Sequence, residues 1–128
     1  MATKISNFSV LSTGDKAITG LTFMPNHVDF YMAQKSGVTE NFAHLSTGSA
    51  NGVAQMAHSV FQDTTAGKTQ SYFDRCINHK SRVSGAITDV LTAAFVSFDD
   101  NGSGVYGFTI NVSVLADLPQ KIYYIARD

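Results

Sequence analysis

Short runs in which apolar and polar residues alternate recur along the whole chain. The clearest run covers residues 27–34, where Val28, Phe30 and Met32 point to one side and their neighbours to the other. Clusters of Gly, Asn, Asp and Ser separate the runs, as is typical of turns. This rhythm predicts β-strands joined by short turns.

The runs divide the chain into about eight or nine predicted strands. They cover residues 5–11, 16–23, 27–34, 38–46, 53–62, 69–79, 86–98, 105–115 and 120–126. In the second run we place Ala17, Leu21 and Phe23 on one face. Asn-Gly pairs favour tight hairpins, so residues 47–52 and 99–104 are the strongest predicted turns.

Two runs also permit a helix. Residues 53–62 do not separate cleanly into an apolar and a polar face, and residues 88–94 belong to a strongly apolar stretch. Their β-rich neighbours favour a strand in both places. A strongly apolar stretch is typical of a central strand of a sheet.

These elements predict an all-β fold. Short turns imply antiparallel pairing, and two sheets packed face to face would bury the stripes of Phe, Tyr, Ile and Val. A chain of 128 residues suits one domain. We therefore predict a single antiparallel β-sandwich over residues 1–128, jelly-roll-like in its number of strands.

Composition narrows the choice of partners. Charged residues make up 15% of the chain, below the usual quarter, and the net charge is −1. No basic stripe is present, so we expect no nucleic-acid partner. No apolar run approaches the roughly 20 residues of a membrane helix, and the first residues carry no apolar signal segment. We expect the chain to fold in a cytoplasm, without a membrane partner.

The single cysteine and the four histidines give no complete reactive site. Cys76 cannot form an internal disulfide, and we expect it to be a small buried hydrophobe. Strand alternation would place His79 on the opposite face from Cys76, which argues against a catalytic thiol. His27, His44, His58 and His79 lack the spacing of a helical zinc site, so we expect surface or partly buried histidines.

The turn at residues 99–104 resembles the start of a calcium-binding loop. Asp99, Asn101 and Ser103 match its first, third and fifth positions, but the twelfth position is Ile110, which cannot bind a cation. The flanking residues also favour strands. An exposed hairpin turn is the favoured interpretation, and a weak cation site using Asp99, Asp100 and Asn101 is the alternative.

No catalytic motif is complete. The segment Gly67-Lys68-Thr69 lacks the earlier glycine of a phosphate-binding loop, because Gln62 stands there. Ser49 does not occupy the serine position of a G-x-S-x-G elbow. We therefore expect neither an enzyme nor a cofactor.

Three tyrosines are candidates for stacking on sugars. Tyr123 and Tyr124 must face opposite sides of one strand, so one of them should be exposed. Tyr31 is the third candidate. Packing in the core or at an interface is the favoured role for all three.

Three stretches together resemble segments of tailed-phage virion proteins. They are residues 17–31 (AITGLTFMPNHVDFY), residues 94–100 with 107–111 (AFVSFDD and GFTIN), and residues 122–126 (IYYIA). The shared motifs are a TG…F…P segment, an SF…D…GFT pair and a terminal YYxA strand. This sequence departs from the pattern at residues 101–106, which lengthen the hairpin between Asp100 and Gly107.

The resemblance implies a small β-sandwich of the virus particle, commonly a trimer. Because we expect a free-standing domain without a fibre shaft, the favoured function is a capsid decoration (cement) protein. It would be made in the host cytoplasm, bind the major capsid protein or another virion protein, and stabilise the shell as a homotrimer. The alternative is a receptor- or carbohydrate-binding module of a tail fibre or tail tip. We expect Asp100, Asn101, Ser103 and Tyr106 of the lengthened hairpin to contact the partner.

Overall fold

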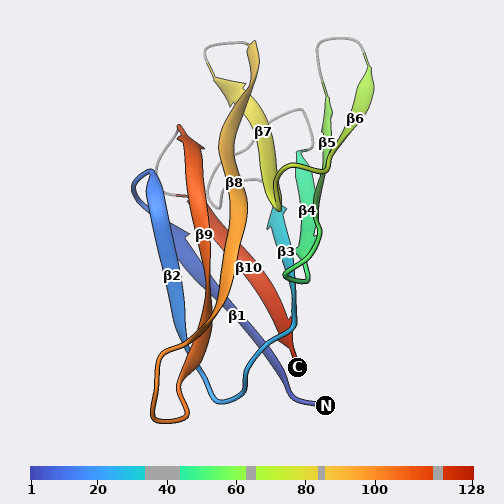
Figure 1. Cartoon of the computed structure of the whole chain (residues 1–128). Coiled ribbons are helices and arrows are strands. Elements are labelled where there is room, and N and C mark those ends of the chain that lie inside the picture. The colour runs from blue at the N-terminus through green and yellow to red at the C-terminus, as the bar shows by residue number, and fades with distance from the viewer. Residues whose placement is uncertain (34–43, 63–65, 84–85, 117–119) are drawn as a thin grey trace.

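The structure is a computed structural model that describes residues 1–33, 44–62, 66–83, 86–116 and 120–128 (Figure 1). Ten strands make up the described part. They are β1 (Thr3–Val10), β2 (Gly14–Leu21), β3 (His27–Ala33), β4 (Leu45–Ala50), β5 (Gln55–Gln62), β6 (Gly67–Tyr72), β7 (Ile77–Val83), β8 (Ala86–Asp100), β9 (Tyr106–Leu115) and β10 (Gln120–Arg127). The all-β prediction is confirmed, and the strand interpretation holds for both runs that permitted a helix.

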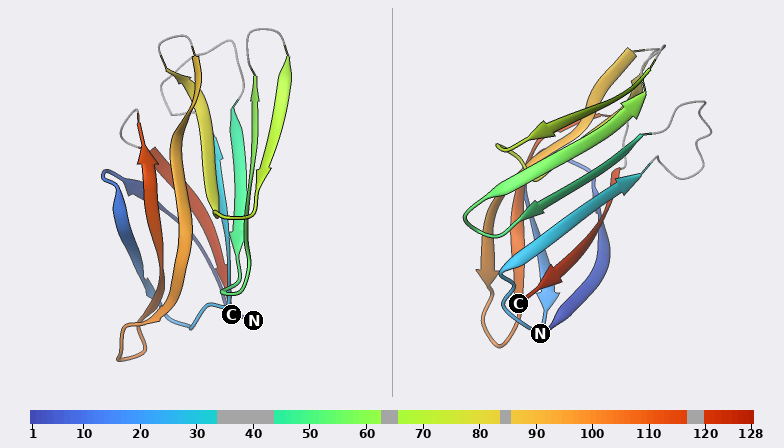
Figure 2. Two further views of the ribbon diagram at one scale, coloured as in Figure 1. Left: turned by 45° about the horizontal axis from the view of Figure 1, so that its top comes forward. Right: turned by 90° about the vertical axis from the view of Figure 1, so that its right-hand side faces the viewer.

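Two antiparallel sheets pack face to face, which confirms the predicted β-sandwich (Figure 2). One sheet has six strands in the order β1-β10-β3-β4-β5-β6, and the other has four in the order β2-β9-β8-β7. The jelly-roll-like feature is that the first strand, β1, pairs with the last, β10, while β2 pairs with β9 in the other sheet. The remaining strands follow one another as hairpins within their sheets.

The two chain ends lie side by side because the first and last strands pair with each other (Figure 1). The backbone N–H of Asp128 donates to the carbonyl of Ala2 at 3.2 Å, and the N–H of Ala2 donates to the Asp128 carboxylate at 2.8 Å. Strand β1 is therefore held along its whole length by β10.

One predicted strand divides in two, which raises the number of strands to ten. Residues 69–79 form the end of β6 and the start of β7, and these two strands belong to different sheets. Between β6 and β7 the chain crosses from one sheet to the other and passes close to Gly48 of β4. A Cβ atom on Gly48 would lie 1.7 Å from the carbonyl oxygen of Cys76, so only glycine leaves room for the crossing chain.

The fourth predicted strand ends too early. Strand β4 includes residues 47–50, which the sequence predicts as part of a turn, while predicted strand positions 38–43 lie outside the described residues. The turn itself begins at Asn51, whose side-chain oxygen accepts hydrogen bonds from the N–H groups of Val53 and Ala54. Gly52 follows with a φ of 83°, as a tight turn requires.

The predicted apolar face of β2, with Ala17, Leu21 and Phe23, is wrong at Ala17. Ile18 and Leu21 are buried, whereas Ala17 is exposed. The pairing of β2 with β9 shifts register between Ile18 and Leu21, and Gly20 in this segment has a φ of 88°. This irregularity breaks the simple alternation of faces along the strand.

Aromatic rings join the two sheets at the centre of the core. Phe108 of β9 is fully buried, and its ring makes edge-to-face contacts with Phe8, Phe30 and Tyr124 at centroid distances of 6.3, 5.7 and 5.2 Å. These three partners come from β1, β3 and β10 of the opposite sheet. Phe108 is therefore the residue through which the sheets are most directly connected.

Candidate functional site

The hairpin between β8 and β9 extends beyond the end of the sandwich (Figure 1). Its tip, residues 101–105, is exposed. The N–H of Asn101 donates to the carbonyl of Val105 at 2.9 Å, and the N–H of Val105 donates to the carbonyl of Gly102 at 3.0 Å. These bonds fix the backbone of the tip, where Ser103 takes a φ of 55°.

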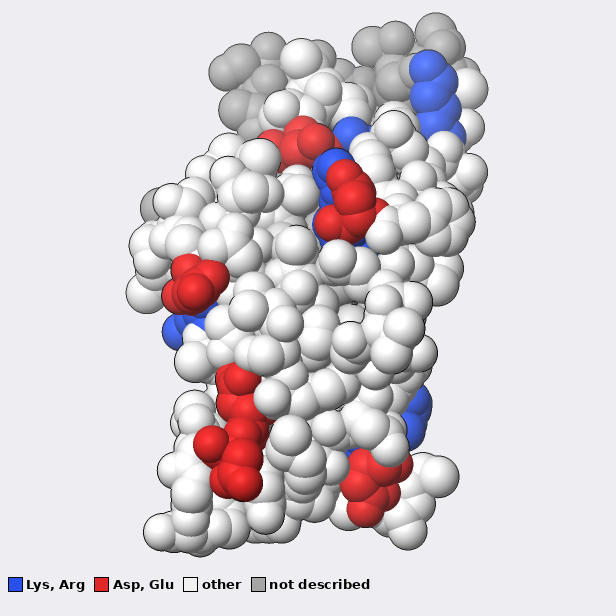
Figure 3. Space-filling view, in the orientation of Figure 1, with Lys and Arg blue, Asp and Glu red and all other residues white. Residues whose placement is uncertain are grey.

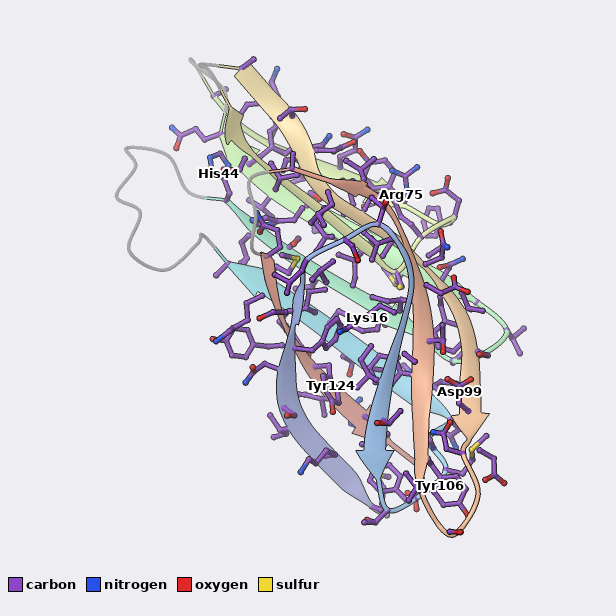
Figure 4. All side chains as sticks on the ribbon, turned by 90° about the vertical axis from the view of Figure 1, so that its left-hand side faces the viewer. Lys16, His44, Arg75, Asp99, Tyr106 and Tyr124 are labelled. Carbon is purple, nitrogen blue, oxygen red and sulfur yellow. The ribbon has the colours of Figure 1, made fainter. Side chains whose placement is uncertain are left out.

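The structure brings three of the four predicted contact residues to the surface of this hairpin. Asp100, Asn101 and Ser103 are exposed. Tyr106 is different, because it is partly buried and packs against the core at the start of β9. Figure 4 labels Tyr106 and Asp99 at this end of the molecule.

The two aspartates of the hairpin do not converge on a common point. Asp99 accepts hydrogen bonds from the hydroxyls of Ser97 at 2.5 Å and Thr109 at 2.6 Å. Asp100 accepts a bond from the backbone N–H of Gly102 at 2.9 Å. Among the described residues, no group of three or more His, Cys, Asp or Glu side chains could hold a metal ion. These contacts are those of a self-contained hairpin turn.

Two of the four histidines are more buried than predicted. His44 and His79 are each only 3% exposed. The Nδ1 atom of His79 lies 2.9 Å from the hydroxyl oxygen of Ser46, so β7 is linked to β4 across the sandwich. Burial is the main cause that lowers the pKa of His79 to about 4, and His44 adds electrostatic repulsion. His79 is therefore neutral at pH 7.

The Ser46–His79 pair has the hydroxyl of a nucleophile and the imidazole of a general base, but the hydroxyl is not accessible to a substrate. Ser46 is 4% exposed, so a substrate has no access to its hydroxyl. We assign the pair a structural role, as a satisfied polar contact within the core.

A second buried polar network links β5, β7 and β8. Asn78 is completely buried, and its amide nitrogen donates to Thr92 at 3.0 Å and to Asp89 at 3.2 Å. The hydroxyl of Ser59 donates to the Asn78 side chain at 3.1 Å, and Lys80 pairs with Asp89 at 2.6 Å. This network links one strand of the six-stranded sheet to two strands of the four-stranded sheet.

Cys76 is fully buried, which agrees with the prediction of a small buried hydrophobe. Burial raises the pKa of its thiol to about 12. Since only the thiolate reacts, we expect modification by a disulfide reagent at pH 8 to be at least about a hundredfold slower in the native protein than in urea. A Val53→Cys substitution in a Cys76→Ala background provides the exposed control, because Val53 is 95% exposed. Equal rates at the two positions would contradict this expectation.

The outer face of the six-stranded sheet carries a pair of exposed tyrosines. Tyr31 of β3 is directly opposite Tyr123 of β10, and their exposed fractions are 40% and 48%. Tyr124 is 4% exposed and points into the core, which confirms that the last two tyrosines face opposite sides. The right-hand view of Figure 2 looks onto the neighbouring strands β3 to β6.

A shallow cavity of about 310 Å³ lies beside Tyr31 on this face. Strands β3, β4 and β5 supply its lining, which consists of Asp29, Tyr31, Thr47, Gly48, Ser49 and Met56. The sequence showed that Asp29 and Tyr31 share a face. It could not show that β4 and β5 add Thr47, Ser49 and Met56 to them, because residues 47–50 are predicted as a turn.

Asp29 is held in place by two basic side chains. Its Oδ1 lies 2.9 Å from Nε2 of His27, and its Oδ2 accepts a bond from Nη1 of Arg127 at 2.5 Å. The carboxylate is therefore fixed beside the cavity, and Arg127 balances its charge.

The opposite side of the molecule, formed by the four-stranded sheet, has few charges. Figure 3 shows acidic and basic side chains on it in small separate groups, with uncharged surface between them. Within the described residues there is no helix long and apolar enough to cross a membrane.

No family model, curated protein or solved structure matches this chain.

Proposed function

We propose that the chain is a structural virion protein of a tailed phage, a decoration protein that binds the outer capsid surface without catalysis. Its partner would be the major capsid protein or another virion protein, and it would act as a homotrimer on the particle. The observation that carries the proposal is the exposed tip of the β8–β9 hairpin. Its backbone hydrogen bonds fix it before binding, so little conformational entropy is lost on contact with a protein.

The motifs that resemble phage virion proteins also support a structural role. Gly107 approaches the backbone of β2, where an added Cβ would lie 1.9 Å from the carbonyl oxygen of Ile18. Phe108 fills the core and Thr109 holds Asp99. The GFT motif thus consists of residues that build the sandwich, which suits a scaffold for attachment better than a catalytic site.

A second candidate function is a receptor- or carbohydrate-binding module of a tail fibre or tail tip. One observation favours it: the exposed Tyr31–Tyr123 pair lies beside a cavity whose lining includes Asp29, Thr47 and Ser49. The two candidates differ in the surface they use, the hairpin tip for the first and the six-stranded sheet for the second.

The capsid proposal is tested by mixing the purified chain with capsids of the encoding phage that lack it and sedimenting the particles. We expect saturable binding, and we expect Asn101→Arg to weaken it at least about tenfold, since a charge at a contact centre costs on the order of 1.4 kcal/mol or more. Gln70→Arg on the exposed edge strand β6 is the matched control and should bind normally.

Light scattering on the same samples tests the trimer, whose mass should be three times the 13.8 kDa of one chain. A strict monomer at high concentration that also fails to bind capsids would refute the capsid proposal. Binding that is unchanged by Asn101→Arg would exclude the hairpin tip as the contact.

A further inference from the structure

The cavity beside Tyr31 combines an aromatic ring with fixed polar groups, an arrangement suited to a sugar. Tyr31 is 40% exposed, and Tyr123, which is 48% exposed, is its cross-strand neighbour on β10. On the other side of Tyr31, Thr47 and Ser49 of β4 line the cavity. The C–H faces of a pyranose ring pack against aromatic rings, while its hydroxyl groups need donors and acceptors at the edge.

Asp29 supplies the strongest acceptor in this site. His27 and Arg127 each engage one of its carboxylate oxygens, so the group is held in a single orientation. Each carboxylate oxygen can accept more than one hydrogen bond, and the side chain is still 18% exposed. Asp29 can therefore accept bonds from sugar hydroxyls without losing its present partners.

The charge and size of the cavity narrow the class of ligand. Asp29 is the one charged residue among the six that line it, and Arg127 balances that charge. A phosphate or another anion would be repelled by the carboxylate and would meet no lining cation. The volume of about 310 Å³ lies at the small end of ligand sites, which suits one or two sugar rings.

We propose that the cavity lined by Asp29, Tyr31, Thr47, Ser49 and Met56 is a binding site for a neutral saccharide. Tyr31 and Tyr123 form the stacking platform, and Asp29 with the two hydroxyls selects the orientation of the ring. This inference rests on the second candidate function and names the class of ligand for the same cavity, a neutral saccharide.

The test is an NMR titration of the whole chain with methyl glycosides of glucose, galactose, mannose and N-acetylglucosamine at millimolar concentration. We expect at least one of them to bind and to shift backbone signals of β3, β4 and β5. Tyr31→Ala should weaken binding at least about tenfold, and Thr47→Val should weaken it severalfold. Phe73→Ala, at a position that is 76% exposed, is the control and should bind normally.

Two results would overturn the saccharide site. One is the absence of binding by all four sugars, and the other is binding that neither Tyr31→Ala nor Thr47→Val weakens in proteins shown to be folded. Capsid sedimentation separates this proposal from the first one. Asn101→Arg should leave sugar binding intact, and Tyr31→Ala should leave capsid binding intact. If Tyr31→Ala instead abolishes capsid binding, the outer face of the six-stranded sheet is a protein interface, and the saccharide proposal fails.

Discussion

Replacing Phe108 with alanine is expected to lower the free energy of unfolding by about 3–5 kcal/mol. The side chain is fully buried and makes edge-to-face contacts with Phe8, Phe30 and Tyr124. Its removal takes away both buried apolar area and three aromatic contacts, and it leaves a cavity between the sheets. The partners lie on three different strands, so they cannot close this cavity by a small local shift.

Urea denaturation followed by circular dichroism measures this loss. Phe73→Ala is the matched control, since Phe73 is 76% exposed and its removal should change stability by less than about 0.5 kcal/mol. A Phe108→Ala protein that unfolds within about 1 kcal/mol of the wild type would show that the sheets are held mainly by other contacts.

The alternation of residues predicted the strands best where each strand is regular. In β3, Val28, Phe30 and Met32 are buried as expected, and in β10 Tyr124 is buried while Tyr123 is exposed. These strands lie inside their sheets and have a neighbour on each side. Regular pairing keeps every second side chain on the core face, so the pattern of the sequence is preserved in the structure.

The alternation failed where the chain changes sheets. Residues 69–79 predict one continuous strand, although β6 ends at Tyr72 and the chain then crosses the sandwich. The crossing between β6 and β7 needs the space left by Gly48, which lies 28 residues before Cys76 in the sequence. A contact between distant segments leaves no mark in the local pattern.

Short connections were also a poor guide to pairing. Only residues 11–13 separate β1 from β2, yet these strands lie in different sheets. Such a link turns a corner of the sandwich instead of closing a hairpin. The same limit applies to the sites: the tip of the β8–β9 hairpin is local and could be predicted, whereas the cavity beside Tyr31 needs the register of three strands.

Acidification from pH 6.5 to pH 4 is expected to destabilise the protein by up to about 3 kcal/mol through His79. The pKa of His79 is lowered from 6.5 to about 4 in the folded state, mainly by burial and then by His44. Between these two values the unfolded chain binds a proton that the folded chain does not. The stability is therefore complete above pH 6.5, falls as the pH is lowered, and stops changing through this residue below about pH 4.

Most of this pH range lies above the pKa of carboxylates in the unfolded chain. The pKa of Asp74 is lowered from 3.8 by its hydrogen bond to Arg75, so the stability that it contributes is lost mainly below pH 4. His79→Gln keeps a polar side chain beside Ser46 but cannot take up the proton. We expect this variant to be less stable at pH 7 and to show a smaller loss of stability between pH 6.5 and 4, measured by urea denaturation at each pH. Equal losses in the two proteins would show that His79 is not the group that responds. A smaller loss in the variant would identify the buried Ser46–His79 contact as the acid-sensitive link between β4 and β7.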